Sequence, residues 1–410
     1  MHVLALNPAY AVEENLYDLD GFVPPLVDLA YLRSLGVKVQ PAPETLAALS
    51  EGSRIFARRL ADHTLLPRRQ CSIEAFDPDT VSDEIHNYTG RCPTLTFEIN
   101  PVRGCGVGCQ YCLVTDGVHE QPLVVDENYP LYVRRLLERQ NGPESDTRNH
   151  YYYFSPKTEA LQEATLQTGV AHRILREFDA HFQRNPASRA RLFIASKAGE
   201  AHLQTSCEGE TILDIFARLR GRMQFNTSVS MMPPALRTLL EPGAAPIEER
   251  LKAVQACRQY GIPADSALVQ PIFTPFLTDE HISSFFDALY AAGIRNYKPE
   301  FLTVCMENLA MLGPLLGRFN RDLERQLYED YLLPSNADHR KQRGRTAPDR
   351  TRSLACLDRM MRYTDTLGMS VSICYWVRKQ LGITEEQIPL INRNGYQCLG
   401  YQSKLFADVQ

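Results

Sequence analysis

Apolar and polar positions follow a regular rhythm from residue 94 to residue 304. Short apolar runs alternate with longer stretches in which apolar residues recur every three or four positions. These are the patterns of buried strands and of amphipathic helices. The predicted strands are Thr94–Ile99, Tyr151–Phe154, Arg191–Ser196, Met223–Val229, Asp265–Pro271 and Tyr297–Val304. The predicted helices between them are Pro130–Arg139, Thr165–Arg184, Thr211–Leu219, Ile247–Tyr260 and His281–Ala292.

Strands that alternate with helices in this way predict an α/β fold, with a parallel sheet and helices outside it. Right-handed crossovers arrange such a series either as an open doubly wound sheet or as a partial barrel. In both arrangements ligands bind at the C-terminal ends of the strands. We therefore expect the functional site where these strands end.

The flanking segments have other patterns. Near the N-terminus we predict a strand at His2–Leu6, a helix at Pro25–Leu35 that Gly36 ends, and a strand at Val37–Val39. Late in the chain, Leu323–Tyr331 and Leu354–Thr366 are predicted helices. The chain is thus expected to have three parts: a small α/β N-terminal extension (1–93), an α/β unit (94–312) and a mostly helical C-terminal extension (313–410).

Composition and charge narrow the classes of partner. No apolar run reaches the roughly 18 residues of a membrane span, and the N-terminus lacks the basic region and cleavage site of a signal peptide. We therefore expect a cytoplasmic protein with no membrane partner. The formal net charge of −5 disfavours tracking of a nucleic-acid backbone. A basic run within residues 339–352 keeps a nucleic-acid partner open as an alternative.

The cysteines give the most specific chemistry. Eleven cysteines, an odd number, argue for metal ligation or reactive thiols and against a disulfide framework. Cys105, Cys109 and Cys112 lie together in a segment that also contains Gly104, Gly106 and Gly108. Three thiolates at this spacing suit three corners of a cubane iron–sulfur cluster, and the glycines let the backbone wrap closely and offer amide donors.

Two other metal sites are less consistent with this pattern. A structural zinc site prefers four closed ligands, usually as two cysteine pairs, and no second pair lies at a typical spacing. An electron-transfer ferredoxin would supply four cysteines. Three ligands leave one iron open to an exogenous ligand, as in a catalytic cluster. A non-catalytic iron–sulfur protein stays open as an alternative.

The cysteine segment resembles the signature of the radical S-adenosylmethionine (SAM) superfamily. Cys105, Cys109 and Cys112 follow the first strand of the α/β unit, and the aromatic Tyr111 directly precedes the last cysteine. The resemblance implies a partial (β/α)6 barrel over about 94–304 and a [4Fe-4S] cluster whose open iron binds SAM. It also implies an external electron donor of the flavodoxin or ferredoxin type and a 5′-deoxyadenosyl radical that abstracts a substrate hydrogen.

Three further stretches are similar to the spore photoproduct lyase-like branch of that superfamily. They are Phe154–Glu159 with Gln167–Gly169, Ile194–Lys197, and Leu240–Gly243 with Glu248–Arg250. In that branch the lysine that Lys197 matches meets the SAM carboxylate. The lyase also uses a cysteine a few tens of residues after the cluster, but here no cysteine lies between Cys112 and Cys207. This difference disfavours repair of DNA photoproducts.

The candidate site residues follow from the resemblance and from strand-end positions. SAM would be bound by Tyr111, Ser155, Ser196, Lys197, Asn226 and Ser228, with Ser230 nearby; strand-end capping is the alternative for the polar residues. Candidate hydrogen-atom donors are Cys305, Cys374 and Cys398, which could instead form an auxiliary cluster or be small buried apolar residues.

The predicted function is therefore hydrogen abstraction from a small polar metabolite, in biosynthesis. Repair or modification of a nucleic acid is the alternative.

Overall fold

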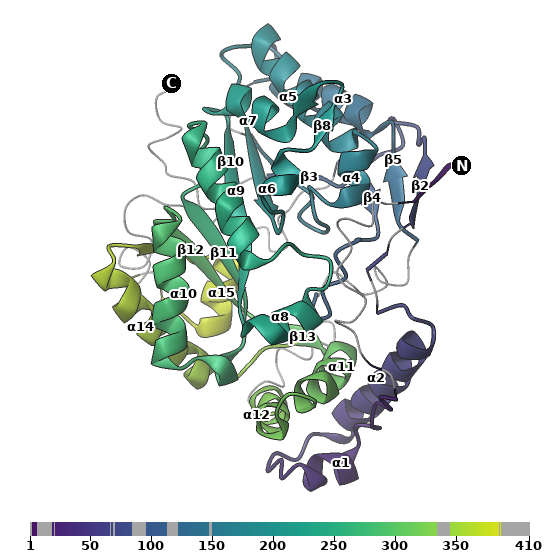
Figure 1. Cartoon of the computed structure of the whole chain (residues 1–410), viewed down its shortest axis with the longest axis vertical. Coiled ribbons are helices and arrows are strands. Elements are labelled where there is room, and N and C mark those ends of the chain that lie inside the picture. The colour runs from purple at the N-terminus through teal and green to yellow at the C-terminus, as the bar shows by residue number, and fades with distance from the viewer. Residues whose placement is uncertain are drawn as a thin grey trace.

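A computed structural model describes residues 2–5, 19, 21–65, 67–68, 70–83, 96–112, 122–146, 150–333, 345–384 and 386. At its centre lies a seven-stranded parallel sheet (Figure 1). Its order is β15-β12-β11-β10-β7-β6-β3, so that neighbouring strands follow one another along the chain. Its strands are β3 (Thr96–Ile99), β6 (His150–Phe154), β7 (Ala190–Ser196), β10 (Met223–Met231), β11 (Ser266–Ile272), β12 (Asn296–Phe301) and β15 (Ser370–Val371). The predicted parallel α/β fold is confirmed.

Helices that follow the strands cover one face of this sheet. Apolar side chains on that face, among them Phe97, Tyr152 and Ile194, pack into the larger hydrophobic core with the apolar sides of the helices. These helices are α3 (Tyr129–Asn141), α4 (Glu163–Gln167), α5 (Val170–Arg184), α6 (Glu200–Leu203), α7 (Ile212–Leu219), α9 (Ile247–Gln259), α10 (Asp279–Ala291), α14 (Arg350–Thr366) and α15 (Tyr375–Leu381).

The opposite face of the sheet is more polar, and we call it the inner face. Residues paired in register on parallel strands share a face, which groups Glu98 with Tyr153 and Phe193, and Ser228 with Leu268 and Lys298. Only a small apolar cluster lies here, built on Phe193 and Leu268. The inner face is defined by Glu98, Tyr153, Phe193, Ala195, Asn226, Ser228, Leu268, Gln270, Lys298 and Glu300.

A second core joins the N-terminal helices to three helices from later in the chain. Helices α1 (Leu29–Ser34) and α2 (Pro43–Ala61) pack with α8 (Pro234–Leu240), α11 (Met306–Gly317) and α12 (Arg321–Tyr331) at one end of the molecule (Figure 1). A smaller sheet of order β1-β2-β5-β4 packs against the larger core. Its strands are β1 (His2–Ala5), β2 (Gln70–Glu74), β4 (Val102–Arg103) and β5 (Val124–Asp126). Short antiparallel pairs are β8 (Ser206–Cys207) with β9 (Glu210–Thr211), and β13 (Val304–Cys305) with β14 (Arg345–Thr346).

Several predicted elements differ from the structure. The predicted helix Thr165–Arg184 is two helices, α4 and α5, because Gly169 between them adopts a positive φ of 70°. The predicted strand at 37–39 is wrong: this segment has no regular structure, and Val37 packs in the second core. Neither α2 nor α11 was predicted. Gly36 does end the first helix, at a φ of 78°.

In the part of the chain that the structure describes, no helix combines the length and apolar character needed to cross a membrane.

Candidate functional site

Residues 104–112, which we call the cysteine loop, follow β4 near the C-terminal end of β3. Two of the loop's glycines, Gly104 and Gly108, have positive φ angles of 78° and 69°, which glycine adopts without steric cost. The loop is held from two sides. The Gly106 N–H donates to Gln162 Oε1 at 2.8 Å, and the Gly243 N–H donates to the Val107 carbonyl at 2.8 Å.

The three thiols of this loop are close neighbours. Cys109 is buried, while Cys105 and Cys112 are half-buried. Burial, with a smaller contribution from the charge of Cys112, raises the pKa of Cys105 to about 11. Burial also raises the pKa of Cys109, to which the charges of both other cysteines contribute. Without metal the thiols of Cys105 and Cys109 are therefore protonated at neutral pH, and a bound metal has to displace the protons.

This donor set fits a cubane cluster better than a single ion. Among the described residues, no three His, Cys, Asp or Glu side chains converge where one metal ion could sit. In a cubane each thiolate binds a different iron, so the sulfurs need not converge on one point. Three neighbouring thiols on one glycine-rich loop satisfy that requirement.

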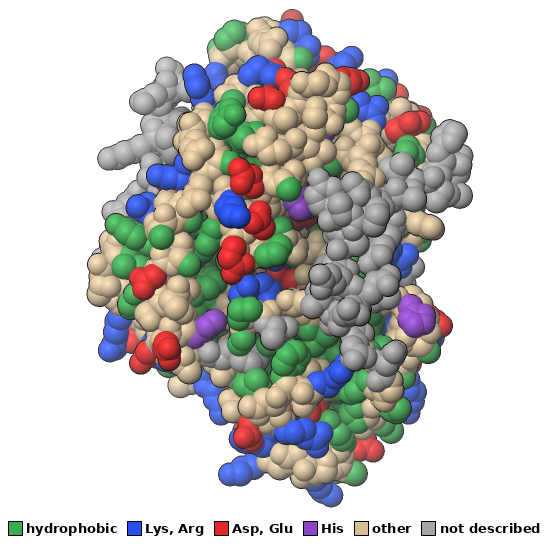
Figure 2. Space-filling model, in the orientation of Figure 1, with side chains coloured by type: hydrophobic (Ala, Val, Ile, Leu, Met, Phe, Trp, Pro, Cys, Tyr) green, Lys and Arg blue, Asp and Glu red, His purple; other side chains and the backbone are tan. Residues whose placement is uncertain are grey.

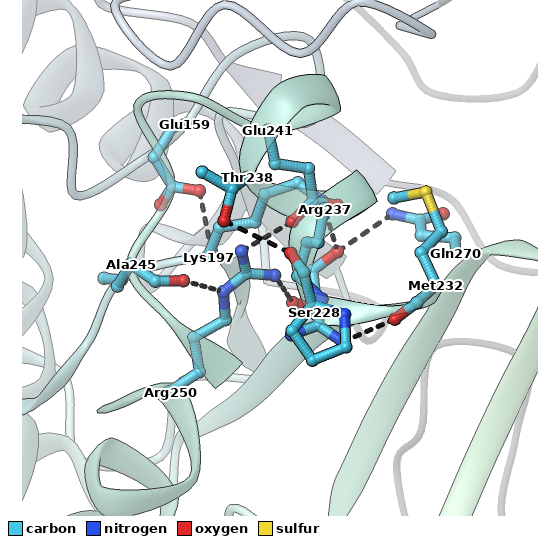
Figure 3. Close-up of polar contacts among 12 residues, drawn as sticks. Glu159, Lys197, Ser228, Met232, Arg237, Thr238, Glu241, Ala245, Arg250 and Gln270 are labelled. Carbon is cyan, nitrogen blue, oxygen red and sulfur yellow. Dashed lines mark hydrogen bonds and ion pairs between the residues drawn. The ribbon is translucent and has the colours of Figure 1, made fainter. Parts of the chain in front are cut away.

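A buried polar network lies directly against the loop (Figure 3). Glu241, which follows α8, accepts a hydrogen bond from the Tyr111 hydroxyl. Lys197, which follows β7, places its Nζ 3.3 Å from Glu241 Oε1, 3.1 Å from the Tyr111 hydroxyl and 3.3 Å from Ser228 Oγ. The positive charge of Lys197 also lowers the pKa of the Cys109 thiol, against the larger effect of burial. The network therefore connects the cysteine loop to the ends of β7 and β10.

Arg250, on α9, anchors this network. Its guanidinium donates to Glu241 Oε2 at 2.6 Å, to the Ser228 carbonyl at 2.9 Å and to the Ala245 carbonyl at 2.6 Å. The side chains of Arg250 and Glu241 are 1% and 0% exposed. Burial raises the pKa of Glu241, but the charges of Arg250 and Lys197 more than offset it and hold the pKa well below its ordinary value. Glu241 is thus a fixed negative charge between two cations.

A second carboxylate fixes the backbone at the end of β7. Glu159 accepts from the Ser196 hydroxyl and from the Lys197 N–H, the latter at 2.8 Å. It also accepts from the Leu161 N–H at 3.1 Å. These bonds set the direction in which the Lys197 side chain leaves the strand.

A cavity of about 490 Å³ opens beside these residues. The cysteine loop contributes Gly106 and Val107 to its wall, but none of the three cysteines of the loop lines it. Glu159, Lys197 and Glu241 line it as well. The cavity has room for a ligand next to the network.

The structure brings together some of the predicted SAM-binding residues and not others. Lys197 is hydrogen-bonded to both Tyr111 and Ser228, and Ser196 is tied to the same strand end through Glu159. Ser155 is separate: it is buried at a φ of 53° with its Oγ 3.5 Å from the Ile99 carbonyl.

Two more polar residues of β10 complete this group. Asn226 lies deeper in the sheet and accepts from Gln224 Nε2 at 2.9 Å. Ser230 is fully buried at the end of the strand.

Two of the predicted hydrogen-donor cysteines, Cys305 and Cys374, make their hydrogen bonds outside the network. Cys305 caps the N-terminus of α11, where its Sγ is 2.6 Å from Asn308 Oδ1 and accepts from the Asn308 N–H at 3.5 Å. Cys374 accepts from the Val377 N–H at 3.5 Å at the start of α15. Neither lines the cavity. Cys398 lies outside the described residues, and a donor role for the three remains a prediction.

Sequence reasoning did not identify Glu159, Glu241 or Arg250 as site residues. All three lie in the stretches that resemble the lyase-like branch. The sequence signal for these residues was that their stretches were expected to meet at the ends of the strands. That signal singles out the three residues only once the fold is known.

Comparisons with known proteins give distant similarities. No family model and no curated protein matches the chain. Among solved structures, the chain is similar to SuiB of Streptococcus suis bound to the precursor peptide SuiA, with 11% identity, a TM-score of 0.36, and coverage of 62% of this chain and 44% of SuiB. For SuiB bound to S-adenosylmethionine the identity is 13%, the TM-score 0.37, and the coverage 76% and 57%. For methylornithine synthase (PylB) these values are 9%, 0.34, 86% and 95%. The chain thus spans about half the length of the SuiB chains that it matches.

Proposed function

We propose that the chain is a radical SAM enzyme whose [4Fe-4S] cluster is bound by Cys105, Cys109 and Cys112. The observation that carries this proposal is the contact of a three-thiol, glycine-rich loop with a buried lysine–carboxylate network at the ends of parallel strands. When bound, the cluster and SAM supply a 5′-deoxyadenosyl radical that removes a hydrogen atom from the substrate.

Each residue of the network has a distinct role in this proposal. Lys197 offers an ammonium group to the SAM carboxylate, and Ser228 and Tyr111 offer hydroxyl groups beside it. Glu241 and Glu159 hold Lys197 in place, one through its side chain and one through its backbone. The burial of Tyr111 and Cys109 excludes water from the side of the loop that faces the network.

We also propose the lyase-like branch and the partial barrel that it implies. The three stretches on which the resemblance rests converge at the cysteine loop: Glu159 bonds Lys197, and Glu241 bonds both Lys197 and Tyr111. The sequential order of the parallel strands supports the barrel topology.

The proposed substrate is a small polar metabolite, and the proposed reductant is a flavodoxin or ferredoxin. Nucleic acid is less consistent with the face of the molecule drawn in Figure 2, where Lys and Arg are interspersed with Asp and Glu. Of the basic run at 339–352, Arg350 donates to the Leu381 carbonyl at 2.8 Å and Arg352 pairs with Asp330. Residues 339–344 of the run lie outside the described residues.

The proposal is tested by the formation of 5′-deoxyadenosine. Anaerobically reconstituted protein with dithionite and SAM should produce it, as measured by mass spectrometry, and the Cys112→Ala variant should not. Equal production by Cys112→Ala, or none from a fully loaded wild-type cluster, would contradict the proposal.

A second variant tests the role of Lys197. We expect Lys197→Ala to weaken SAM binding while the iron content stays at the wild-type level, because the lysine contacts no backbone of the loop. Lys252→Ala, at an exposed position on α9, is the control. An unchanged SAM affinity for Lys197→Ala would show that this lysine does not hold the cofactor.

A further inference from the structure

The ammonium group of Lys197 already uses all of its hydrogen-bond donors. A lysine side chain has three N–H donors and no acceptor. Its Nζ is 3.1 Å from the Tyr111 hydroxyl, 3.3 Å from Ser228 Oγ and 3.3 Å from Glu241 Oε1. A fourth acceptor, such as the carboxylate that Lys197 is proposed to receive, therefore has to replace one of these three.

The cavity beside the network indicates which acceptor is replaced. Lys197 and Glu241 line this cavity, whereas Tyr111 and Ser228 do not. A ligand in the cavity therefore meets Lys197 together with Glu241. Of the three acceptors that hold the ammonium group, Glu241 is the one with which such a ligand competes.

Glu241 keeps other partners when it releases the lysine. Its Oε2 accepts from Arg250 at 2.6 Å, and its Oε1 accepts from the Tyr111 hydroxyl. Ser228 Oγ, by contrast, would keep only the Gln270 Nε2 donor at 3.5 Å. Because a buried polar group without a partner is costly, Glu241 is the acceptor that can lose Lys197 at the smallest cost.

The ion-paired side chains of the network also lack one negative charge. Lys197 and Arg250 share the single carboxylate of Glu241, and the three side chains are 14%, 1% and 0% exposed. Glu159 does not make up the difference, because it is bonded to the Ser196 hydroxyl and to backbone N–H groups. One more carboxylate would give each buried cation a partner of its own, which favours a ligand that carries one.

We propose that Glu241 is an internal competitor for Lys197 and that the SAM carboxylate displaces it. In the resting protein Glu241 lies between the two cations, beside Lys197 and Arg250 (Figure 3). When the cofactor binds, the ammonium group of Lys197 passes to its carboxylate, and Glu241 stays with Arg250 and Tyr111. The inference rests on the proposed function, since it concerns how SAM enters the same site. Glu241 is then a positioning residue whose release accompanies cofactor binding.

Crystal structures of the reconstituted wild-type protein test the exchange directly. The two ligands would be SAM and decarboxylated SAM, which lacks only the carboxylate. With SAM, we expect Lys197 to bond the ligand carboxylate and to lie beyond hydrogen-bond distance of Glu241, while the pair of Glu241 with Arg250 stays intact. With decarboxylated SAM, Lys197 should stay on Glu241. A bond between Lys197 and Glu241 in both complexes would overturn the inference.

Binding of the same two ligands gives a second test. The preference for SAM is the ratio of its affinity to that of decarboxylated SAM, measured by anaerobic titration calorimetry. Glu241→Gln should raise this preference about tenfold, because a neutral amide competes for the ammonium group less strongly than a carboxylate. The ratio cancels a general loss of folded protein, since both ligands bind the same state. If Glu241 only held Lys197 in place for SAM, the preference would fall, and a lowered or unchanged preference would refute the exchange.

A matched variant separates competition from the loss of a nearby negative charge. Glu159→Gln removes a carboxylate that lines the same cavity but bonds Lys197 only through its backbone N–H, at 2.8 Å. We expect it to change the preference for SAM much less than Glu241→Gln does. An equal rise in the two variants would mean that charge alone acts, and would overturn the inference. If Glu241→Gln does not fold, the wild-type crystal structures decide.

These measurements also distinguish the inference from the function on which it rests. Formation of 5′-deoxyadenosine by a protein whose Lys197 stays on Glu241 in the SAM complex would overturn the exchange and leave the radical SAM assignment in place. Displacement of Glu241 by SAM, without 5′-deoxyadenosine from a fully loaded cluster, would support the exchange and contradict the assignment.

Discussion

Glu241 carries a negative charge at a position that water does not reach. Burial alone would raise the pKa of this carboxyl group, but Arg250 and Lys197 lower it below its ordinary value. The carboxylate therefore holds three groups at once: the guanidinium of Arg250, the ammonium of Lys197 and the hydroxyl of Tyr111. A neutral group of the same shape would hold them far less strongly.

The first prediction at this scale is that Glu241→Gln destabilises the protein. It would leave Arg250 buried without a negative partner, which costs about 3–5 kcal/mol. Chemical unfolding would measure the loss. Glu249→Gln is the control, since the exposed pair of Glu249 with Lys252 contributes at most about 1 kcal/mol. Equal losses in the two variants would show that the buried charge does not stabilise the site.

Gly243 packs against the backbone of the cysteine loop. A Cβ atom at this position would lie 2.7 Å from the Val107 carbonyl oxygen and 2.8 Å from that of Gly106, both of them backbone atoms. We therefore expect Gly243→Ala to displace the loop and lower the iron bound per protein after reconstitution. The accompanying loss of stability should be about 1–3 kcal/mol. Gly221→Ala, where a Cβ atom would contact nothing within 4 Å, should retain wild-type iron content; the same loss there would refute the prediction.

The sequence predicts the residues of this site that have a local signal. The cysteines are recognisable because their spacing alone specifies a cluster, and Lys197 because it directly ends a strand. Glu241 has no such signal. It lies 44 residues from Lys197 and 130 from Tyr111 along the chain, and acidic residues after a helix are common. Only the packing of the loop after α8 against the cysteine loop gives it a role.

At the scale of elements, the alternating core helices and strands were predictable, as were α1 and α12 of the second core, whereas α2 and α11 were not. The buried positions of α2 have helical spacing, but several are small or polar, including Thr45, Gly52 and Ser53. Gly52 lets α2 approach α11 closely, since a Cβ atom there would lie 2.6 Å from the Cα of Glu307. Helix α11 contains two glycines and a proline, and almost all of its residues are buried, so it shows neither an amphipathic stripe nor favourable helix propensity.

The junction between α5 and β7 has a histidine that makes folding sensitive to acid. His181 Nε2 lies 2.9 Å from the Ser188 hydroxyl, which also accepts from the Ala190 N–H at 3.3 Å. Burial lowers the pKa of His181 to about 4, while in the unfolded chain it is about 6.5.

We predict that this histidine contributes to loss of stability between about pH 6.5 and pH 4. Because its pKa is lowered, His181 stays neutral in the folded protein at pH values at which it is protonated in the unfolded chain. Stability is therefore complete above the unfolded value and falls as the pH drops, by about 2–3 kcal/mol. Guanidinium unfolding of His181→Gln across this range should show a shallower pH dependence than the wild type. The exposed His63→Asn should match the wild type; an unchanged slope for His181→Gln would contradict the prediction.

At the scale of the whole molecule, the cysteine loop lies at the boundary between two cores. The larger core surrounds the outer face of the parallel sheet. The second core gathers α1, α2, α11 and α12, and it includes Val107, Cys109 and Tyr111 of the loop itself. The N-terminal helices are therefore coupled to the cysteine loop through packing. A pattern in the sequence cannot predict this coupling, because it depends on contacts between segments that are more than 200 residues apart, such as Tyr31 with Glu324.

This arrangement predicts that equally destabilising substitutions in the two cores have unequal effects on how firmly the proposed cluster is held. Phe56 on α2 and Phe178 on α5 are both almost fully buried, one in each core. Phe56→Leu and Phe178→Leu should each cost about 1–2 kcal/mol of unfolding free energy. Only Phe56→Leu should also speed the loss of iron to a chelator, because it loosens the core in which Cys109 and Tyr111 pack. Equal rates of iron loss at equal stability would mean that the second core does not hold the loop, and that the N-terminal helices serve stability alone.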